Sequence, residues 1–274
     1  MSATADTIWQ VPAYLPYIQP LLTEAAVVSA ERKIGYKLPT EYLNLLKKQN
    51  GGYIRYSLTE MVHDSIAGIG PHFPSLTGFD WDECQECVSF PLQDLVPFDG
   101  DGHWHLCLDY RQQTGAPTIT YVNIECDRES PIAASFADYL VKLRIDVGDE
   151  YVVEAVSEIE KLTSELSAAL GITLEAPDNF AHGYPTFRGR LGTEKNPQWV
   201  WISPNIVQRG FVRPDHARYA ELKDLMAGLA LRFPEVPPDG YILSATDAVR
   251  TNVVRACVRS GMAIRPLNEY VQDS

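Results

Sequence analysis

The sequence has no long apolar run, and it lacks the motifs that reveal many enzymes. No stretch approaches the ~20 apolar residues that cross a bilayer, and the first residues show neither the cationic start nor the apolar run of a signal peptide. There is no Gly-x-Ser-x-Gly elbow and no Walker loop. We therefore expect a cytoplasmic protein that does not insert into membranes, has no cofactor and is not an enzyme.

Cysteine is scarce, and the number of cysteines is odd. The chain of 274 residues has 5 of them: Cys84, Cys87, Cys107, Cys126 and Cys257. A chain of this length does not need a disulfide framework, so reduced thiols are the simpler expectation. The single Cys-x-x-Cys pair at Cys84 and Cys87 lacks a second pair of ligands at the spacing of a zinc site.

Positive charge is missing from one long stretch. Between Arg55 and Arg111 the sequence has ten acidic residues and no Lys or Arg. The whole chain has 23 basic and 36 acidic residues, a net charge of −13, and residues 1–148 carry −9 of it, with 10 basic and 19 acidic residues. This balance disfavours nucleic acid or an anionic membrane as the partner. It predicts a docking face for a basic protein, and a solvated acidic surface without a partner is the alternative.

Aromatic residues alternate with these acidic residues. An acidic rim around aromatic anchors is typical of protein interfaces. We expect most of the rings to fill a core, and Trp81, which lies between Asp80 and Asp82, to be partly exposed. The predicted partner-binding residues are Asp80, Trp81, Asp82, Glu83, Glu86, Asp99, Asp101 and Trp104.

The length allows either one large domain or two ordinary ones. A Gly-Asp pair at residues 148–149 separates two expected helices. The first helix begins at Ser130 and Pro131, and the second runs from near Val152 to Gly171. We predict two domains, residues 1–148 and 149–274. A helical hairpin inside one domain is the alternative.

The first half has the pattern of an α+β domain. Helices are expected from Thr23 to Ile34, ending at Gly35, and from Leu38 to the Asn-Gly-Gly at residues 50–52. Strands are expected over residues 104–110 and 118–124, where side chains alternate or are β-branched. Helices followed by antiparallel strands and a closing helix predict helices packed on a mostly antiparallel sheet.

The second half reads as a mixed α/β region. Strands are expected over residues 199–202, 206–212 and 241–243, and a helix over residues 214–233. Thr246 is expected to cap a last helix that ends at Gly261.

One histidine pair allows a different function. His103 and His105 lie two apart on an expected strand and therefore share a face, together with Asp109. Such a face can hold a metal if a third ligand converges on it. A metal-dependent enzyme that uses His103, His105 and Asp109 is therefore an alternative, and ordinary polar strand residues are the simpler interpretation.

Several short motifs, taken together, resemble one protein family. They are Glu31-Arg-Lys-Ile-Gly35, Leu38-Pro39-Thr-Glu-Tyr42-Leu43, Asn50-Gly51-Gly52, Asp99-Gly-Asp101-Gly102, Cys107-Leu108-Asp109-Tyr110-Arg111 and Ser135-Phe136-Ala-Asp-Tyr139-Leu140. In this order and spacing they resemble the SUKH superfamily, whose founding members include a yeast regulator of cell-wall synthesis. The resemblance covers residues 20–145, and residues 150–274 resemble no family that we recognise.

The resemblance implies an α+β fold and a binding function. Many bacterial members are similar to immunity proteins, which neutralise a toxin that is often a nuclease, and other relatives act as interaction scaffolds. For this chain the resemblance implies a bacterial immunity protein that occludes the active site of a cognate basic toxin, with an intracellular scaffold as the alternative. The family shares no catalytic residues, and Asn50, Gly51, Gly52, Asp99 and Asp101 are expected to set turns.

Overall fold

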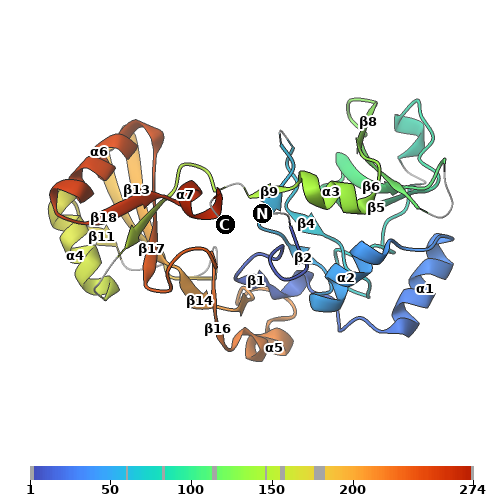
Figure 1. Cartoon of the computed structure of the whole chain (residues 1–274), viewed down its shortest axis with the longest axis horizontal. Helices are drawn as coiled ribbons and strands as arrows, with labels where there is room; N and C mark the ends of the chain where they lie inside the picture. Colours follow the sequence, from blue (N-terminus) through green and yellow to red (C-terminus); the bar gives the residue numbers. More distant parts are fainter. Residues whose placement is uncertain are drawn as a thin grey trace. The chain divides into compact units, whose positions relative to one another are not determined.

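The chain divides into two compact units, residues 2–146 and 147–274 (Figure 1). The computed structural model describes residues 3–59, 61–81, 84–112, 116–145, 147–154, 158–175 and 183–272. The predicted boundary between residues 148 and 149 lies close to this division. That each unit folds without the other stays a prediction.

Two helices open the first unit, and local sequence signals set their ends. Helix α1 (Glu24–Ile34) begins after Thr23, whose hydroxyl accepts a hydrogen bond from a backbone N–H of the first turn at 3.1 Å. It ends at Gly35, which has a φ of 90°. Helix α2 (Thr40–Lys48) turns one face inward, with Tyr42, Leu45 and Leu46 buried. Both helices agree with the sequence-based expectation.

The segment after α2 is fixed by a buried side chain, that of Asn50. Its amide nitrogen donates to the carbonyls of Pro20 at 2.6 Å and Ile69 at 3.0 Å. Its Oδ1 accepts the N–H of Ile69 at 2.9 Å. Gly51 has a φ of 89°, and a Cβ there would lie 2.5 Å from the backbone nitrogen of Gly68. Only glycine fits this position, because the φ is left-handed and the neighbouring backbone is too close.

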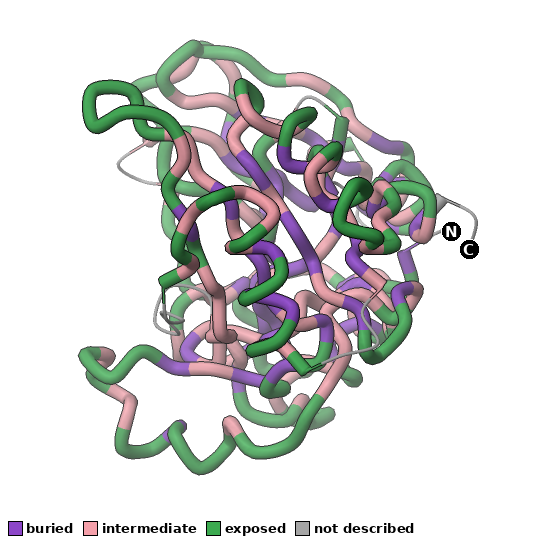
Figure 2. Tube along the Cα trace, turned by 90° about the vertical axis from the view of Figure 1, so that its left-hand side faces the viewer, coloured by how far each residue is buried: buried purple, intermediate pink, exposed green. Residues whose placement is uncertain are grey.

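A four-stranded antiparallel sheet forms the centre of this unit. Its order is β5 (Leu95–Gly100), β6 (Trp104–Asp109), β7 (Thr118–Asn123) and β8 (Arg128–Ala133). Leu106 and Leu108 of β6 belong to the same core as the buried residues of α2 and of α3 (Phe136–Lys142). Cys107, on the other face, packs with Leu92. Both faces of β6 are therefore covered, and in Figure 2 such buried segments are purple while most loops are green.

The chain between β7 and α3 differs from the sequence-based prediction. Residues Ser130 and Pro131 do not begin a helix; they pair with β7 as part of the edge strand β8. An edge strand tolerates proline because one side of its ladder is unpaired. The helix begins instead after Ser135, whose hydroxyl accepts the N–H of Asp138 at 3.0 Å.

Short elements complete the first unit. They are β1 (Ala13–Tyr14), β2 (Gly52–Tyr53), β3 (Tyr56–Ser57), β4 (Ser65–Ile66), β9 (Arg144–Ile145) and the 3-10 turns η1 (Leu15–Tyr17) and η2 (Gln85–Cys87). β2 pairs with β4, and β3 pairs with β9. The first pairing brings the residues after α2 alongside the segment that precedes the main sheet.

The second unit contains a six-stranded antiparallel sheet. Its order is β11 (Leu174–Glu175), β12 (Phe187–Thr193), β13 (Asn196–Pro204), β17 (Gly240–Ala245), β10 (Tyr151–Glu154) and β18 (Ala263–Pro266). Helices α4 (Ile159–Leu170) and α6 (Asp247–Arg259) contribute Leu166 and Cys257 to its core. The strands β14 (Ile206–Gln208) and β16 (Leu229–Leu231) pair separately, and β15 (Gly210–Phe211), α5 (Tyr219–Leu222), η3 (Lys223–Met226) and α7 (Leu267–Gln272) complete the unit. Both units are α+β.

Two predicted helices of the second unit are wrong in part. Val152 does not begin a helix, because it lies in β10, where it and Val153 are buried on opposite faces. The predicted helix over residues 214–233 is limited to α5 and the following 3-10 turn. Gly228, with a φ of 97°, breaks it, and Leu229 begins a strand and is exposed instead of facing inward.

The described helices are short. The longest, α6, has 13 residues. No helix in this part of the chain has both the length and the apolar character needed to cross a bilayer.

Replacing Asn50 with alanine should destabilise the protein strongly. The change removes three hydrogen bonds and leaves the N–H and carbonyl of the buried Ile69 without partners. We expect a loss of about 3 kcal/mol of unfolding free energy in urea titrations. Asn44→Ala is the control, because Asn44 is exposed on α2 and should change stability by less than about 0.5 kcal/mol. Equal losses in the two variants would contradict this role of Asn50.

Candidate functional site

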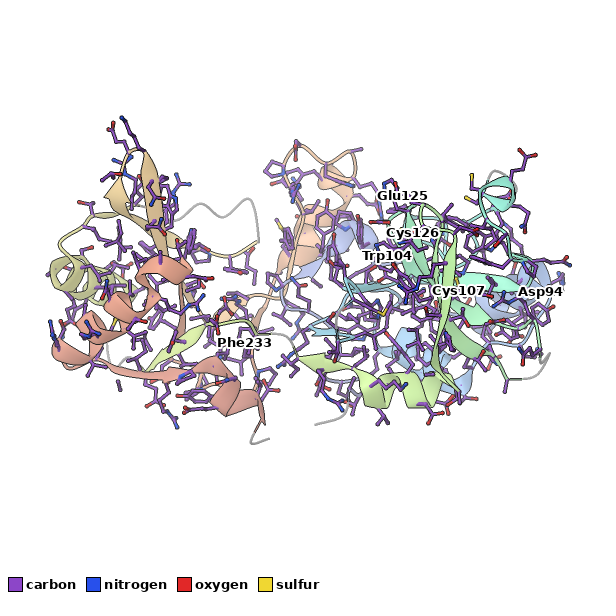
Figure 3. All side chains as sticks on the ribbon, turned by 90° about the horizontal axis from the view of Figure 1, so that it is seen from above. Asp94, Trp104, Cys107, Glu125, Cys126 and Phe233 are labelled. Atoms are coloured by element: carbon purple, nitrogen blue, oxygen red, sulfur yellow. The ribbon has the colours of Figure 1, made fainter. Side chains whose placement is uncertain are left out.

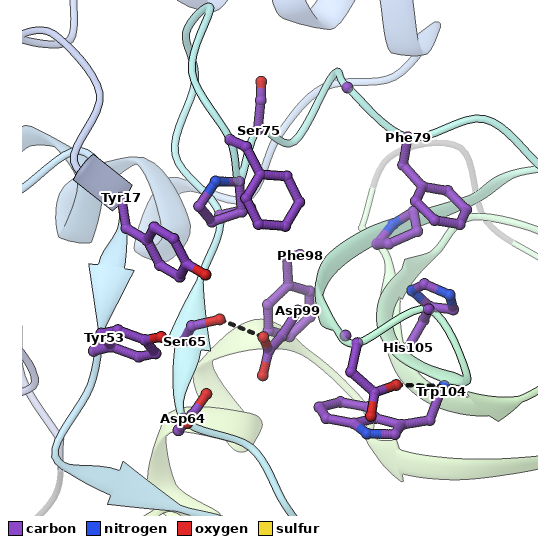
Figure 4. Close-up of a pocket in the computed structure, with 18 of the residues that line it drawn as sticks. Tyr17, Tyr53, Asp64, Ser65, Ser75, Phe79, Phe98, Asp99, Trp104 and His105 are labelled. Atoms are coloured by element: carbon purple, nitrogen blue, oxygen red, sulfur yellow. Dashed lines mark hydrogen bonds between the residues drawn. The ribbon is translucent and has the colours of Figure 1, made fainter. Parts of the chain in front are cut away.

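A pocket of about 660 Å³ opens in the first unit (Figure 4). Its lining comes from η1, β2, the segment between β4 and residue 79, and the β5–β6 turn. The lining includes Tyr17, Tyr53, Asp64, Phe73, Phe79, Asp99, Asp101, Trp104 and His105. A pocket of this volume is in the range of sites that hold a small molecule or one long side chain.

One wall of the pocket is held in place by Gln19. This buried side chain receives the N–H of His72 on its Oε1 at 2.9 Å. Its amide nitrogen donates to the carbonyls of His72 and Pro74, the latter at 2.9 Å. Gln19 also donates its own backbone N–H to the carbonyl of Asn50 at 2.8 Å. The wall is therefore connected, through Gln19, to the backbone carbonyl of Asn50.

The floor of the pocket is a chain of buried polar groups. Asp99 accepts a hydrogen bond from the hydroxyl of Ser65, and its other oxygen lies 2.5 Å from Nδ1 of His63. Nε2 of His63 lies 2.5 Å from the hydroxyl of Tyr139 on α3. The Asp99 side chain is only 4% exposed and the His63 side chain is 0% exposed. This chain connects β4, β5 and α3.

The rim of the pocket is a tight turn between β5 and β6. Asp101 accepts the backbone N–H groups of His103 at 2.9 Å and Trp104 at 3.1 Å. Partial burial opposes ionisation of Asp101, but these hydrogen bonds prevail and lower its pKa. Gly102 has a φ of 99°, a conformation that the turn needs and that glycine adopts without strain. Asp101 thus both shapes the turn and carries a negative charge.

Aromatic rings line opposite sides of the pocket. Tyr17 and Tyr53 have ring centroids 5.0 Å apart, and Phe73 contacts Tyr17 edge-on at 5.7 Å. Phe73 is 74% exposed, and Phe79 is 38% exposed. Trp104 is stacked on Tyr121 at 5.9 Å. Rings of this size left in contact with solvent at a pocket are typical of a binding site.

The ionisable groups of the pocket make it negative. Burial and the nearby carboxylate of Asp99 raise the pKa of Asp64. Burial lowers the pKa of His105 to about 4, although Asp101 and Asp99 oppose this change, so His105 is neutral at pH 7. No Lys or Arg is among the described residues that line the pocket.

The predicted partner-binding residues fall into separate groups. Trp104 and Asp101 lie at the pocket, and Asp80 follows the lining residue Phe79 and is exposed. Trp81 is half-buried as expected, and its indole N–H donates to the carbonyl of Leu95 at 2.8 Å.

The remaining predicted residues are Asp82, Glu83, Glu86 and Asp99. Glu86 is exposed on η2. Asp82 and Glu83 lie outside the described residues. Asp99 lies at the floor of the pocket, where its carboxylate is turned inward to His63 and Ser65, and its part in partner binding stays a prediction.

The three residues of the metal alternative do not come together. His103 precedes β6, is exposed and pairs with Glu125 at 2.7 Å, at the end of the sheet where Figure 3 labels Trp104 and Glu125. His105 is buried. Asp109 is held by Arg111 at 2.7 Å and by the hydroxyl of Thr120. Among the described residues, no group of three His, Cys, Asp or Glu side chains is placed to hold a metal ion.

The cysteines in the described residues are all free thiols. Burial raises the pKa of the Cys107 thiol well above its usual value, which keeps it protonated. Cys107 is therefore a core residue.

Sequence reasoning named Asp99, Asp101 and Trp104 but missed the other residues that build the pocket. Tyr17, Gln19, Tyr53 and His63 lie far from one another along the chain and carry no shared motif. Asp64 was counted among the ten acidic residues but was not singled out. The acidic stretch was the only signal that pointed here.

The comparison with known families applies to the unit that contains this pocket. Residues 21–142 match the SMI1 / KNR4 family (SUKH-1). The N-terminal part of the chain contains a SUKH domain. This match confirms the resemblance that the motifs indicate, and every residue that lines the pocket except Tyr17 lies within it. A search of curated proteins found no match.

The buried imidazole of His105 in the SUKH domain should make the stability depend on pH. Its pKa falls from 6.5 to about 4 on folding, so the unfolded chain binds a proton below pH 6.5 that the folded chain does not. The contribution of His105 to the free energy of unfolding is therefore fully present above pH 6.5. It is lost as the pH drops towards 4, by up to about 3 kcal/mol. In urea titrations at pH 7 and 4.5, His105→Phe should lose less unfolding free energy than the natural protein.

The control for this comparison is His103→Phe, which removes an exposed histidine and keeps the buried one. It should show the same loss between pH 7 and 4.5 as the natural protein. If His105→Phe and the natural protein lose equal amounts, the buried imidazole does not cause the pH dependence.

Proposed function

We propose that this chain is a bacterial immunity protein that binds a cognate cationic toxin and covers its active site. The observation that carries the proposal is the acidic SUKH domain, in which residues 56–110 contain ten acidic residues and no Lys or Arg. SUKH domains are often found in immunity proteins. A toxin that acts on nucleic acid needs a basic site for phosphate, and an acidic protein surface complements such a site.

The ten acidic residues have different roles in the fold. Asp99 and Asp109 are used inside, by His63 and Arg111. Asp64, Asp80, Glu86 and Asp101 are exposed, and Asp94 is half-buried. Glu60, Asp82 and Glu83 lie outside the described residues. Negative charge therefore remains at the surface after the internal pairs are formed, and it is available to steer a basic partner.

The two tryptophans beside these acidic residues are already ordered. The ring of Trp81 contacts Phe79 and His105 edge-on, at centroid distances of 4.6 and 5.1 Å. Trp104 is stacked on Tyr121. An aromatic anchor held in one orientation loses little conformational entropy on binding, so these rings can contribute much of their contact energy to a complex.

The mechanism needs no chemistry from this chain. The acidic surface accelerates encounter with a basic toxin, and the aromatic residues provide contact once it has docked. Neutralisation follows because the bound SUKH domain excludes the substrate of the toxin.

Reversing two surface charges should slow association with the partner. The partner is first captured from a lysate of the source organism at low salt and identified by mass spectrometry. Asp80→Lys combined with Glu86→Lys should lower its association rate about tenfold and weaken the dependence of that rate on salt, as measured by surface plasmon resonance.

Asp215→Lys combined with Asp224→Lys is the matched control. Both residues are exposed in the second unit, and the pair changes the net charge by the same amount. If both double variants slow association equally, the effect is due to net charge and the acidic face is not the interface.

Neutralisation is tested in cells. Expression of the captured partner should stop growth, and co-expression of the full chain should restore it. A captured partner that is harmless, or one whose toxicity the full chain does not relieve, would contradict the immunity function and favour a scaffold.

A further inference from the structure

The pocket of the SUKH domain combines flat aromatic surfaces with carboxylates, and no described Lys or Arg lines it. Figure 4 shows Tyr17 and Tyr53 on one side with Asp64 beside them, and Trp104 on the other side. Asp64 is close enough to Tyr53 for its charge to help raise the pKa of that phenol, after the larger effect of burial. A positively charged group between these residues would meet aromatic faces and a carboxylate together.

Asp64 lines the pocket, and no Lys or Arg among the described residues is paired with it. Its side chain is exposed at the pocket and forms no ion pair with any described residue. The neighbouring carboxylates of Asp99 and Asp101 also line the pocket. An anionic ligand would be repelled by these groups, and a purely apolar ligand would desolvate them without compensation.

The wall also contains an unused hydrogen-bond acceptor or donor. His105 is 3% exposed, lines the pocket and has an Nε2 atom that finds no hydrogen-bond partner among the described residues. Buried polar atoms are almost always paired in folded proteins. An unpaired one in the wall of a pocket is therefore a second sign, independent of the acidic residues, that a polar ligand belongs there.

We propose that this pocket binds the side chain of an arginine presented by a cationic protein partner. A guanidinium group is flat, so it stacks on tyrosine and tryptophan rings, and its N–H groups form paired hydrogen bonds with a carboxylate such as Asp64. Its aliphatic stem is apolar and can pack against Phe73 and Phe79. The volume of about 660 Å³ is ample for this side chain and the chain atoms next to it.

The inference that the arginine comes from a toxin rests on the proposed function. The preference of the pocket for a guanidinium group is independent of that function. The two are therefore tested separately. The pocket is tested with a peptide and without any partner protein.

The probe is an acetylated and amidated Gly-Gly-Arg-Gly-Gly peptide, titrated into the full chain and followed by the NMR signal of the Trp104 indole N–H. A peptide with citrulline in place of arginine has the same shape without the charge. We expect the arginine peptide to bind at least about fivefold more tightly than the citrulline peptide. Asp64→Asn should remove most of this difference.

Asp64→Asn is expected to fold, because it removes a carboxylate whose ionisation is already unfavourable in this place. Asp80→Asn is the matched control: it removes one exposed charge from a residue that does not line the pocket, and it should change peptide binding by less than about twofold. Equal binding of the two peptides, no binding of either, or equal losses in the two variants would overturn the proposal.

Other occupants are distinguished in the same titration. Tighter binding of a lysine peptide or of tetramethylammonium than of the arginine peptide would overturn the assignment of a guanidinium group. If the arginine peptide binds as expected but the captured partner is not toxic, the proposal for the pocket is supported and the proposed immunity function is contradicted.

Discussion

The buried amide of Asn50 joins three segments of the SUKH domain that no regular secondary structure connects. It satisfies the carbonyl of Pro20 and both backbone groups of Ile69, while its own carbonyl accepts the N–H of Gln19. Gln19 in turn holds the wall of the pocket. The second unit uses the same solution: the fully buried Asn205 bonds to the backbone of Phe233, Val236 and Pro237. In both units, one side chain replaces the hydrogen bonds that irregular backbone lacks.

The acidic side chains of the SUKH domain have two roles: some form buried hydrogen bonds, and others face the pocket. Asp99 and Asp109 form buried hydrogen bonds that connect strands and helices, so they contribute to the fold. Asp64 and Asp101 are left facing the pocket, close to Asp99. Burial and repulsion from Asp99 raise the pKa of Asp64, so the ionised form of Asp64 is disfavoured in the free domain. A cationic ligand removes this repulsion when it binds, and the relief of the repulsion adds to the free energy of binding.

The sequence predicts the elements whose signals are local. Thr23 and Gly35 mark the two ends of α1, and the alternation over residues 104–109 predicts β6. It fails where a local pattern fits two structures. Ser130-Pro131 suits a helix start as well as an edge strand, and only pairing with β7 decides between them. The pocket could not be predicted, because Tyr17, Tyr53 and Trp104 converge only through the tertiary contacts of the fold.

The side chain of Gln19 binds only backbone groups of the pocket wall. The three hydrogen bonds of its side chain go to the N–H and carbonyl of His72 and to the carbonyl of Pro74, all of which are backbone groups. The path of the wall is thus independent of the side chains it displays, and Phe73, at 74% exposure, is outside the core. Mutations at the wall can therefore change the side chains that the pocket presents at little cost in stability.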